Sequence, residues 1–462
     1  MNVKLQRGMI SVLSANIINL LFNLLTNFLL PKYLSVDSYS AIKTFQLYGM
    51  YIGVFSFGCA DGMYLRYGGK NISKIDKQEL KDCLYTFRLF LVIETILFLI
   101  IAIIIHDAII FATVLTILSL NMTGYFKNLY QASGEFRRYG TILNFTTALT
   151  FLINIILIFI AKIDNYIYYL FGYVTVDAII WIALELYAKR ILGKETKIKR
   201  GKWKLFLLDI KNGFLLMVGN FSSTLLSSLD RWFVKVMMTS LDFAQYSFVV
   251  SLEGFLNTAV TPITVTLYNF FCNTNSRDVV IKVRKYTILF ASALISAAFP
   301  AKFIIEIYLD KYIASIKVLF ILFGAQLFYV PIKGVYVNLY KAKGKQNLYF
   351  LKLVSVLIIG AGLNILFVSI YPFKEAFAYG TLLSAIIWMI LCVVDFKEYG
   401  FSFNEIIYCL IEIIIFLIFG FTMNSIIGFL CYCLVTIIVA FILLKKEFLG
   451  LLKLCFRILK RN

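Results

Sequence analysis

The feature that most constrains this chain is a series of apolar blocks, each about twenty residues long. A block of that length crosses a hydrocarbon core of roughly 30 Å as a helix, because lipid offers no partners to backbone groups outside the segment. Runs such as 84–105 and 411–423 lack the in–out alternation of a membrane β-strand, which excludes a barrel. Apolar residues make up 61% of the chain and charged residues 15%, unlike the balance in soluble domains.

The blocks predict an all-α polytopic membrane protein with about fourteen transmembrane helices. The expected spans are 9–30, 41–64, 84–105, 109–131, 141–161, 166–187, 213–236, 244–269, 286–308, 315–338, 349–370, 375–394, 404–423 and 425–444. The run that follows the N-terminal MNVKLQRG is interpreted as the first helix and not as a signal peptide. It exceeds a typical signal h-region and lacks a small-x-small cleavage site.

Basic residues give the chain a net charge of +20, and they concentrate in alternate short loops between the blocks. This distribution predicts that both termini are cytoplasmic. It also argues against nucleic acid as a partner, because the chain contains no separate basic domain. The connection KRILGKETKIKRGKWK at 189–204 is interpreted as a solvated linker beside anionic lipid, in preference to a regulatory site. Scattered cysteines and a single histidine, His106, predict no metal site and no cofactor.

Two stretches of the chain repeat each other, NMTGYFKNLYQASG at 121–134 and PIKGVYVNLYKAKG at 331–344. Their shared residues keep one separation, as in Gly124 and Gly334 (334 − 124 = 210). A second set, 207 positions apart, pairs Leu34, Tyr39 and Ser40 with Leu241, Tyr246 and Ser247. Chance similarity of apolar helices is the alternative, but N-L-Y-x-A-x-G is not apolar filler.

Six expected spans separate the copies, so the two halves have the same orientation in the membrane. The repeat therefore predicts two parallel six-helix lobes with a central site between them, alternating access, and an additional C-terminal helix pair. The expected parts are a lobe over 1–188, a basic cytoplasmic linker over 189–212, a second lobe over 213–397, and the helix pair with a basic tail over 398–462. Helix interruptions are expected at matching places, namely Gly58 and Gly62 in one half and Thr261–Pro262 in the other.

Polar stripes follow two repeat-related helices at helical spacing. The stripe in the 9–30 helix consists of Asn16, Asn19, Asn23, Thr26 and Asn27. The stripe in the 213–236 helix consists of Asn220, Ser223, Thr224, Ser227, Asp230 and Arg231. Such stripes face protein or water. Hydrogen bonding between helices is the alternative, but two related stripes favour a shared polar cavity.

Charged side chains inside the expected spans are costly and therefore indicate function or pairing. The cations expected to meet an anionic substrate are Lys43, Arg231 and Lys333. The carboxylates expected to couple transport to a proton or sodium ion are Asp61, Glu94, Asp177, Asp230 and Glu253. Asp230 is equally a candidate counter-ion for Arg231, and Glu412, outside the two lobes, is expected to be structural.

Three stretches resemble bacterial polysaccharide (O-antigen and capsule) flippases of the multidrug/oligosaccharidyl-lipid/polysaccharide exporter superfamily. They are LLPKYLSVDSYSAIKTFQLYGMYIGVFSFGCADGMYLRYGG, SSLDRWFVKVMMTSLDFAQYSF and NLYKAKGKQ. The resemblance implies a V-shaped central cavity lined by the helices at 9–30, 41–64, 213–236 and 244–269. It also implies a substrate, an undecaprenyl-diphosphate-linked oligosaccharide moved from the cytoplasmic to the outer leaflet.

The same resemblance implies residence in the bacterial cytoplasmic membrane, contact with membrane lipids, and a polysaccharide polymerase as a partner. In this family a cationic cavity binds the diphosphate and sugar acids, a role that falls here on Lys43 and Arg231. The chain departs from the arginine-rich cavity of the lipid II flippase, because its first helix carries asparagines and no basic residue beyond Arg7. That departure argues against lipid II as the substrate.

The nearest alternative is a proton- or cation-coupled multidrug antiporter of the same fold. Its cavity would be acidic and apolar, so the charges on the cavity helices distinguish the two. A polysaccharide polymerase would need a sizeable outside loop with catalytic residues, whereas every expected outside loop is short. An ATP-driven pump is excluded because G-x-x-x-x-G-K-[ST] is missing. The sequence therefore predicts a transporter and not an enzyme.

Overall fold

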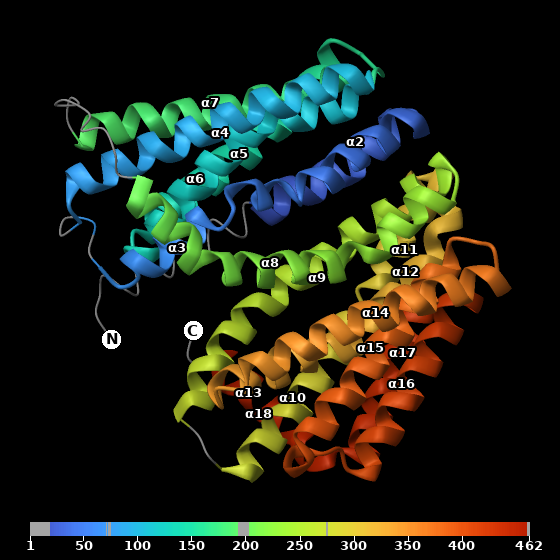
Figure 1. Ribbon diagram of the computed structural model, residues 1–462. Helices are drawn as coiled ribbons and strands as arrows, with labels where there is room; N and C mark the ends of the chain where they lie inside the picture. The colour runs from blue at the N-terminus through green and yellow to red at the C-terminus, as the bar shows by residue number, and fades with distance from the viewer. Residues whose placement is uncertain (1–18, 71, 73–74, 193–202, 274–275, 460–462) are drawn as a thin grey trace. The chain divides into compact units, whose positions relative to one another are not determined.

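A computed structural model describes residues 19–70, 72, 75–192, 203–273 and 276–459, and these residues contain helices and no strand (Figure 1). Within them, eleven helices are long and apolar enough to cross a membrane. The expected spans at 9–30 and 244–269 are also helical where they are described, and the 41–64 span consists of three helical pieces separated by turns. The protein is thus an all-α polytopic membrane protein, as the apolar blocks predicted.

Contacts within the chain divide it into two compact units, residues 1–225 and 226–462, with the division inside one long helix. After a helical segment at 19–33, the elements that begin in the first unit are α2 (Val36–Gly49), η1 (Ile52–Ser56), α3 (Cys59–Tyr67), α4 (Lys77–Ile105), α5 (Ala108–Ala132), α6 (Phe136–Ile155), η3 (Ile156–Ile160), α7 (Tyr166–Leu192) and α8 (Trp203–Met237). The domain boundaries expected from the repeat stay a prediction.

The second unit continues with α9 (Ser240–Asn273), α10 (Arg277–Ile295), α11 (Ala298–Tyr308), η4 (Asp310–Ser315), α12 (Ile316–Pro331), η5 (Ile332–Tyr336), α13 (Val337–Ala342), α14 (Gln346–Ile370), α15 (Glu375–Asp395), η6 (Lys397–Tyr399), α16 (Phe403–Thr422), α17 (Ser425–Leu443) and α18 (Lys445–Leu459). The last three of these helices pack within this unit. The expected C-terminal pair, α16 and α17, is therefore attached to the second half of the chain.

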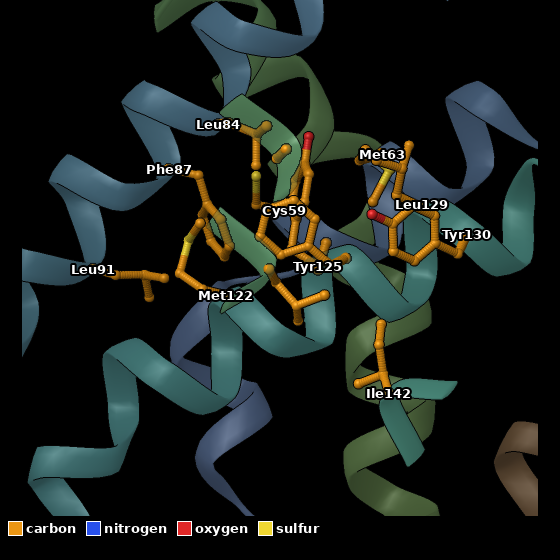
Figure 2. Packing of buried hydrophobic residues seen from close by; sticks show 14 of the residues in the cluster. Cys59, Met63, Leu84, Phe87, Leu91, Met122, Tyr125, Leu129, Tyr130 and Ile142 are labelled. Carbon is orange, nitrogen blue, oxygen red and sulfur yellow. The ribbon is translucent and has the colours of Figure 1, made fainter. Parts of the chain in front are cut away.

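The core of the first unit forms around α5, which packs against α2, α3, α4, α6 and α7. Figure 2 shows this packing, in which Phe87 and Leu91 of α4 lie beside Met122 and Tyr125 of α5. The rings of Phe87 and Tyr125 are 5.3 Å apart between centroids. Both side chains are fully buried, so these faces of α4 and α5 pack against each other inside the unit.

The second unit has an equivalent central helix in α12, which packs against α9, α10, α11, α15 and α16. Of the eleven spans, those that contain α5 and α12 have the largest share of buried residues in their apolar stretch, 56% and 72%. Both carry the repeated sequence at their ends, so the repeat marks the central helix of each unit. The matching positions confirm that two lobes are built on one plan.

The repeated segments end in the same turn. Gly134 and Gly344 both adopt positive φ, +74° and +68°. In each copy the residue after this glycine donates from its backbone N–H to the carbonyl of a repeated tyrosine, Tyr130 or Tyr340, at 2.8 Å. A left-handed residue after the last helical turn is the usual role of a C-terminal glycine. The repeat therefore preserves a helix stop as well as a packing face.

The expected interruption of the 41–64 helix is present at Gly58. Phe57 and Gly58 adopt left-handed conformations and separate η1 from α3. Gly58 and Gly62 also let α3 approach α8 closely, because a Cβ on Gly62 would lie 1.9 Å from the carbonyl oxygen of Asp209. Small residues at this spacing are typical of close helix crossings in membranes.

One expectation was wrong, and two stretches expected as linker and tail contain helix. The interruption at Thr261–Pro262 is not observed, because α9 continues as a helix through both residues. The irregular segment of this half lies instead in the 315–338 span, where α12 ends at Pro331 and η5 is a π-helix. The basic linker and tail are also partly helical, since α8 begins at Trp203 and α18 follows α17 almost directly.

Candidate functional site

The first unit contains a cavity of about 380 Å³ between η1, α3, α5 and α8. Its polar lining consists of the carboxylate of Asp61, three asparagines and two hydroxyl groups, the latter five being Asn121, Asn128, Asn220, Ser56 and Thr224. Asn220 donates to Asp61 Oδ1 at 3.2 Å. Two of the predicted site residues, the carboxylate Asp61 and the stripe residue Asn220, thus meet in one cavity.

The second unit contains a cavity of about 370 Å³ between α9, η5 and α13. Its lining residues are Asn257, Val260, Thr261, Thr264, Lys333, Val337, Asn338 and Lys341. Two of these are lysines, and none of the described residues that line the cavity is acidic. Lys333 Nζ donates to Asn257 Oδ1 at 2.9 Å and lies 5.3 Å from the ring centroid of Tyr329.

The two cavities occupy equivalent places in the two units, because each is lined by a repeated asparagine. In the second unit, Asn338 donates to the carbonyl oxygens of Thr264 in α9 at 2.7 Å and of Gly334 at 2.9 Å. In the first unit, Asn128 donates to the carbonyl oxygen of Ala60 in α3 at 3.4 Å. Each asparagine ties the central helix to the neighbouring helix that forms the opposite wall.

A charged cluster lies beside the cavity of the second unit and brings four predicted residues together. Glu253 interacts electrostatically with Asp230, Arg231 and Lys333. Asp230 is buried, and its Oδ2 accepts from the hydroxyl of Tyr246 at 2.7 Å. Its Oδ1 accepts from the backbone N–H of Arg231 at 2.8 Å.

This cluster extends to neighbouring helices through neutral groups. Gln326 of α12 donates to Glu253, and Thr381 of α15 donates weakly to Asp230 Oδ2 at 3.4 Å. Opposite charges and hydrogen bonds are what a buried carboxylate in a membrane protein requires. Asp230 and Glu253 are therefore each compensated by opposite charges and hydrogen bonds within this unit.

Other predicted residues lie outside these two cavities. Lys43 is buried in α2, where its ammonium donates to Asn27 Oδ1 at 2.9 Å and to Gln46 Oε1 at 3.1 Å. Asn19 donates to Asn144 Oδ1 of α6 at 3.2 Å, so it contributes to helix packing. Asn23 and Ser227 are exposed. Asn16 lies outside the described residues.

Two predicted carboxylates have different surroundings. Asp177 of α7 interacts electrostatically with Lys127 of α5. Glu94 of α4 is buried, and its Oε2 has no hydrogen-bond partner among the described residues. Neither residue lines either cavity.

Sequence reasoning missed several cavity residues. Lys341, Asn257 and Asn121 line the cavities but were not selected. Lys127 lines neither cavity and was not selected either. It lies within an apolar block, where a lysine without a partner is costly. Helical spacing could have identified Asn257, because it lies four residues after Glu253 on the same face of the helix.

Comparison with known proteins gives a fold and no closer relationship. No family model matches the chain, and no curated protein matches it. Among solved structures, the lipid II flippase MurJ in an inward closed conformation superposes with a TM-score of 0.63 at 16% identity, covering 96% of this chain and 99% of that one.

Multidrug transporters share the fold as well. An inward-facing MATE family multidrug resistance transporter of the MOP superfamily gives a TM-score of 0.55 at 13% identity, covering 84% of this chain and 98% of that one. The MATE transporter VcmN of Vibrio cholerae gives 0.52 at 14% identity, with 86% and 95% covered. The chain thus has the polytopic all-helical fold of MOP-superfamily transporters.

Proposed function

We propose that this protein flips an undecaprenyl-diphosphate-linked oligosaccharide from the cytoplasmic to the outer leaflet of a bacterial cytoplasmic membrane by alternating access. The product would serve surface polysaccharide synthesis, as O-antigen or capsule, together with a polysaccharide polymerase. The observation that carries the proposal is the lining of the second-unit cavity, which has two lysines and no acidic residue among its described members. Lysine ammonium groups bind phosphate as point charges.

Each cavity, taken within its own unit, offers groups that suit a polar part of such a substrate. Lys333 and Lys341 provide cationic donors for a diphosphate. The asparagines and hydroxyl groups of the first-unit cavity provide neutral donors and acceptors for sugar hydroxyls. A fold shared with a lipid II flippase supports this use, and the departure in the first helix favours a different glycan.

The predicted cations Lys43 and Arg231 stay part of this proposal. Lys43 is buried with amide oxygens as partners, so binding of an anion would require it to exchange Asn27 or Gln46. Arg231 lies next to Asp230 in the charged cluster. The carboxylates of that cluster, Asp230 and Glu253, are the proposed coupling groups for a proton or sodium ion, with Asp61, Glu94 and Asp177 as further candidates.

Multidrug antiport is the second candidate, and one observation favours it. Asp61 lines the first-unit cavity beside neutral groups, which would suit an organic cation. The lysines of the second-unit cavity oppose such a substrate, because like charges disfavour binding.

A deletion strain with no second flippase tests the proposal directly. Surface glycan should disappear, while lipid-linked units accumulate on the cytoplasmic leaflet. Unchanged surface glycan in that strain would refute the proposal. Loss of drug resistance with normal glycan would favour the antiporter.

Single substitutions test the cavity itself. Lys333→Ala and Lys341→Ala should each lower glycan export about tenfold, since a charge-assisted hydrogen bond contributes at least about 1.5 kcal/mol. Lys345→Ala is the matched control, because Lys345 is an exposed lysine four residues after Lys341 and does not line the cavity. Equal export by all three variants, at equal protein levels, would remove the lysines from the site.

A further inference from the structure

A large apolar groove lies between α6 and α7 in the first unit, with a volume of about 740 Å³. Its walls include Phe145 and Leu149 of α6 and Ala183 of α7, and it shares no lining residue with the polar cavity described above. Arg138 is the one charged residue among the described residues that line it. The groove is therefore apolar along its length and cationic at one end.

The guanidinium of Arg138 contacts aromatic rings, but one of its N–H donors has no hydrogen-bond partner among the described residues. Its guanidinium lies between two tyrosine rings, 5.7 Å from the centroid of Tyr130 and 5.6 Å from that of Tyr187. Its Nε forms an ion pair with Glu135 Oε2 at 3.6 Å, a distance too long for a hydrogen bond, and both side chains are 32% exposed. Its Nη1 is buried and has no hydrogen-bond partner in the described part of the chain. A buried donor without a partner is costly, so the site lacks an acceptor.

The depth of Arg138 in the membrane identifies a suitable acceptor. Arg138 is the first residue of the span Arg138–Ile160, and it follows the connection that the charge distribution assigns to the cytoplasmic side. Guanidinium groups at that level meet the headgroups of anionic lipids. Tyrosines at the same level are typical of the membrane interface.

We propose that this groove binds an anionic phospholipid of the bilayer, with its phosphate on Arg138 and an acyl chain between α6 and α7. A phosphate oxygen supplies the acceptor that Nη1 lacks. The apolar walls accept the chain, and a volume of about 740 Å³ lies within the size range of ligand pockets. The site is independent of the proposed cargo, so failure of either proposal leaves the other standing.

Native mass spectrometry of the purified protein tests this binding. The probes are phosphatidylglycerol and phosphatidylcholine with identical chains, and undecaprenyl phosphate. The wild type should bind phosphatidylglycerol about tenfold more tightly than phosphatidylcholine, and Arg138→Ala should remove that difference. Ala183→Trp, which fills the groove and keeps Arg138, should weaken both phospholipids.

Arg190→Ala is the matched control, because Arg190 ends the span Tyr166–Arg190 and is exposed outside the groove. It should bind phosphatidylglycerol as the wild type does. The proposal is overturned if Arg138→Ala keeps the wild-type preference, or if Arg190→Ala loses it equally. It is also overturned if Ala183→Trp displaces undecaprenyl phosphate and leaves phosphatidylglycerol bound, because the groove would then hold the tail of the cargo.

Discussion

A buried ion pair joins α16 to α10 and permits a quantitative prediction. The side chains of Arg284 and Glu405 are 1% and 0% exposed, and Arg284 Nη2 is 2.7 Å from both carboxylate oxygens. Arg284 Nη1 also donates to the carbonyl oxygens of Tyr399 and Gly400. Glu405 Oε2 accepts from the backbone N–H and the hydroxyl of Ser402, at 2.7 and 2.8 Å. Every polar side-chain atom of Arg284 and Glu405 therefore has a hydrogen-bond partner.

Removing one charge should destabilise the second unit strongly. Arg284→Met leaves the carboxylate of Glu405 buried with only the Ser402 hydrogen bonds, and losing one partner of a buried pair typically costs about 3–5 kcal/mol. A loss of about 3 kcal/mol corresponds to a midpoint roughly 6–12 °C lower for a domain of this size. Arg284→Met with Glu405→Gln should recover much of this, because glutamine keeps an acceptor for Ser402 and carries no charge.

Thermal unfolding in detergent, followed by size-exclusion chromatography, measures these midpoints. Lys343→Met is the control, since Lys343 and Glu398 form a pair that is 34% and 54% exposed, and such pairs contribute about 0–1 kcal/mol. A midpoint for Arg284→Met no lower than that of Lys343→Met would refute the reasoning from burial. A double variant less stable than Arg284→Met would show that charge is not the cause.

Three further changes test the packing, each read as a thermal midpoint. Gly62→Ala should disrupt the crossing of α3 and α8 and lower the midpoint, because its Cβ would lie 1.9 Å from the carbonyl oxygen of Asp209; an unchanged midpoint contradicts the close approach. Gly344→Ala should cost about 1–2 kcal/mol through its positive φ, whereas Gly362→Ala, in a helix with nothing within 4 Å, should be neutral or stabilising. Tyr432→Phe should cost about 1–3 kcal/mol, because its hydroxyl contacts a buried carbonyl of α10 and a buried carboxylate of α16; wild-type stability would mean that the hydroxyl is dispensable.

Features that depend on local sequence could be predicted. The length of the apolar blocks predicted the helices. In lipid, a helix is the conformation in which a single segment satisfies its own backbone hydrogen bonds. The repeated N-L-Y-x-A-x-G determined the helix stops, because Gly134 and Gly344 supply the left-handed residue that both turns need. Glu412 was expected to be structural, and it accepts hydrogen bonds from Tyr432 and Thr436 of α17.

Features that depend on how side chains pair in three dimensions could not be predicted. The sequence identified Lys43 as a charge in a span but did not reveal that Asn27 and Gln46 would satisfy it. Thr261–Pro262 was read as a helix break, yet membrane helices tolerate proline where neighbouring groups replace the lost hydrogen bond. The cluster around Glu253 illustrates the same limit, since its members come from α8, α9 and η5.

The sequence repeat explains why the two cavities share a structural scaffold but differ in the charge of their lining residues. Asn128 and Asn338 make equivalent hydrogen bonds, so the asparagine belongs to the common scaffold. At the same separation of 210 positions, Lys333 corresponds to Thr123 (333 − 123), and Lys127 corresponds to Val337 (337 − 127). Lys127 and Lys333 thus occupy positions of the two repeated segments that differ by one helical turn. Lys333 lines its cavity, whereas Lys127 lies beside the carboxylate of Asp177. The second-unit cavity is therefore lined by lysines, whereas the described lining of the first-unit cavity has Asp61 and neutral polar groups.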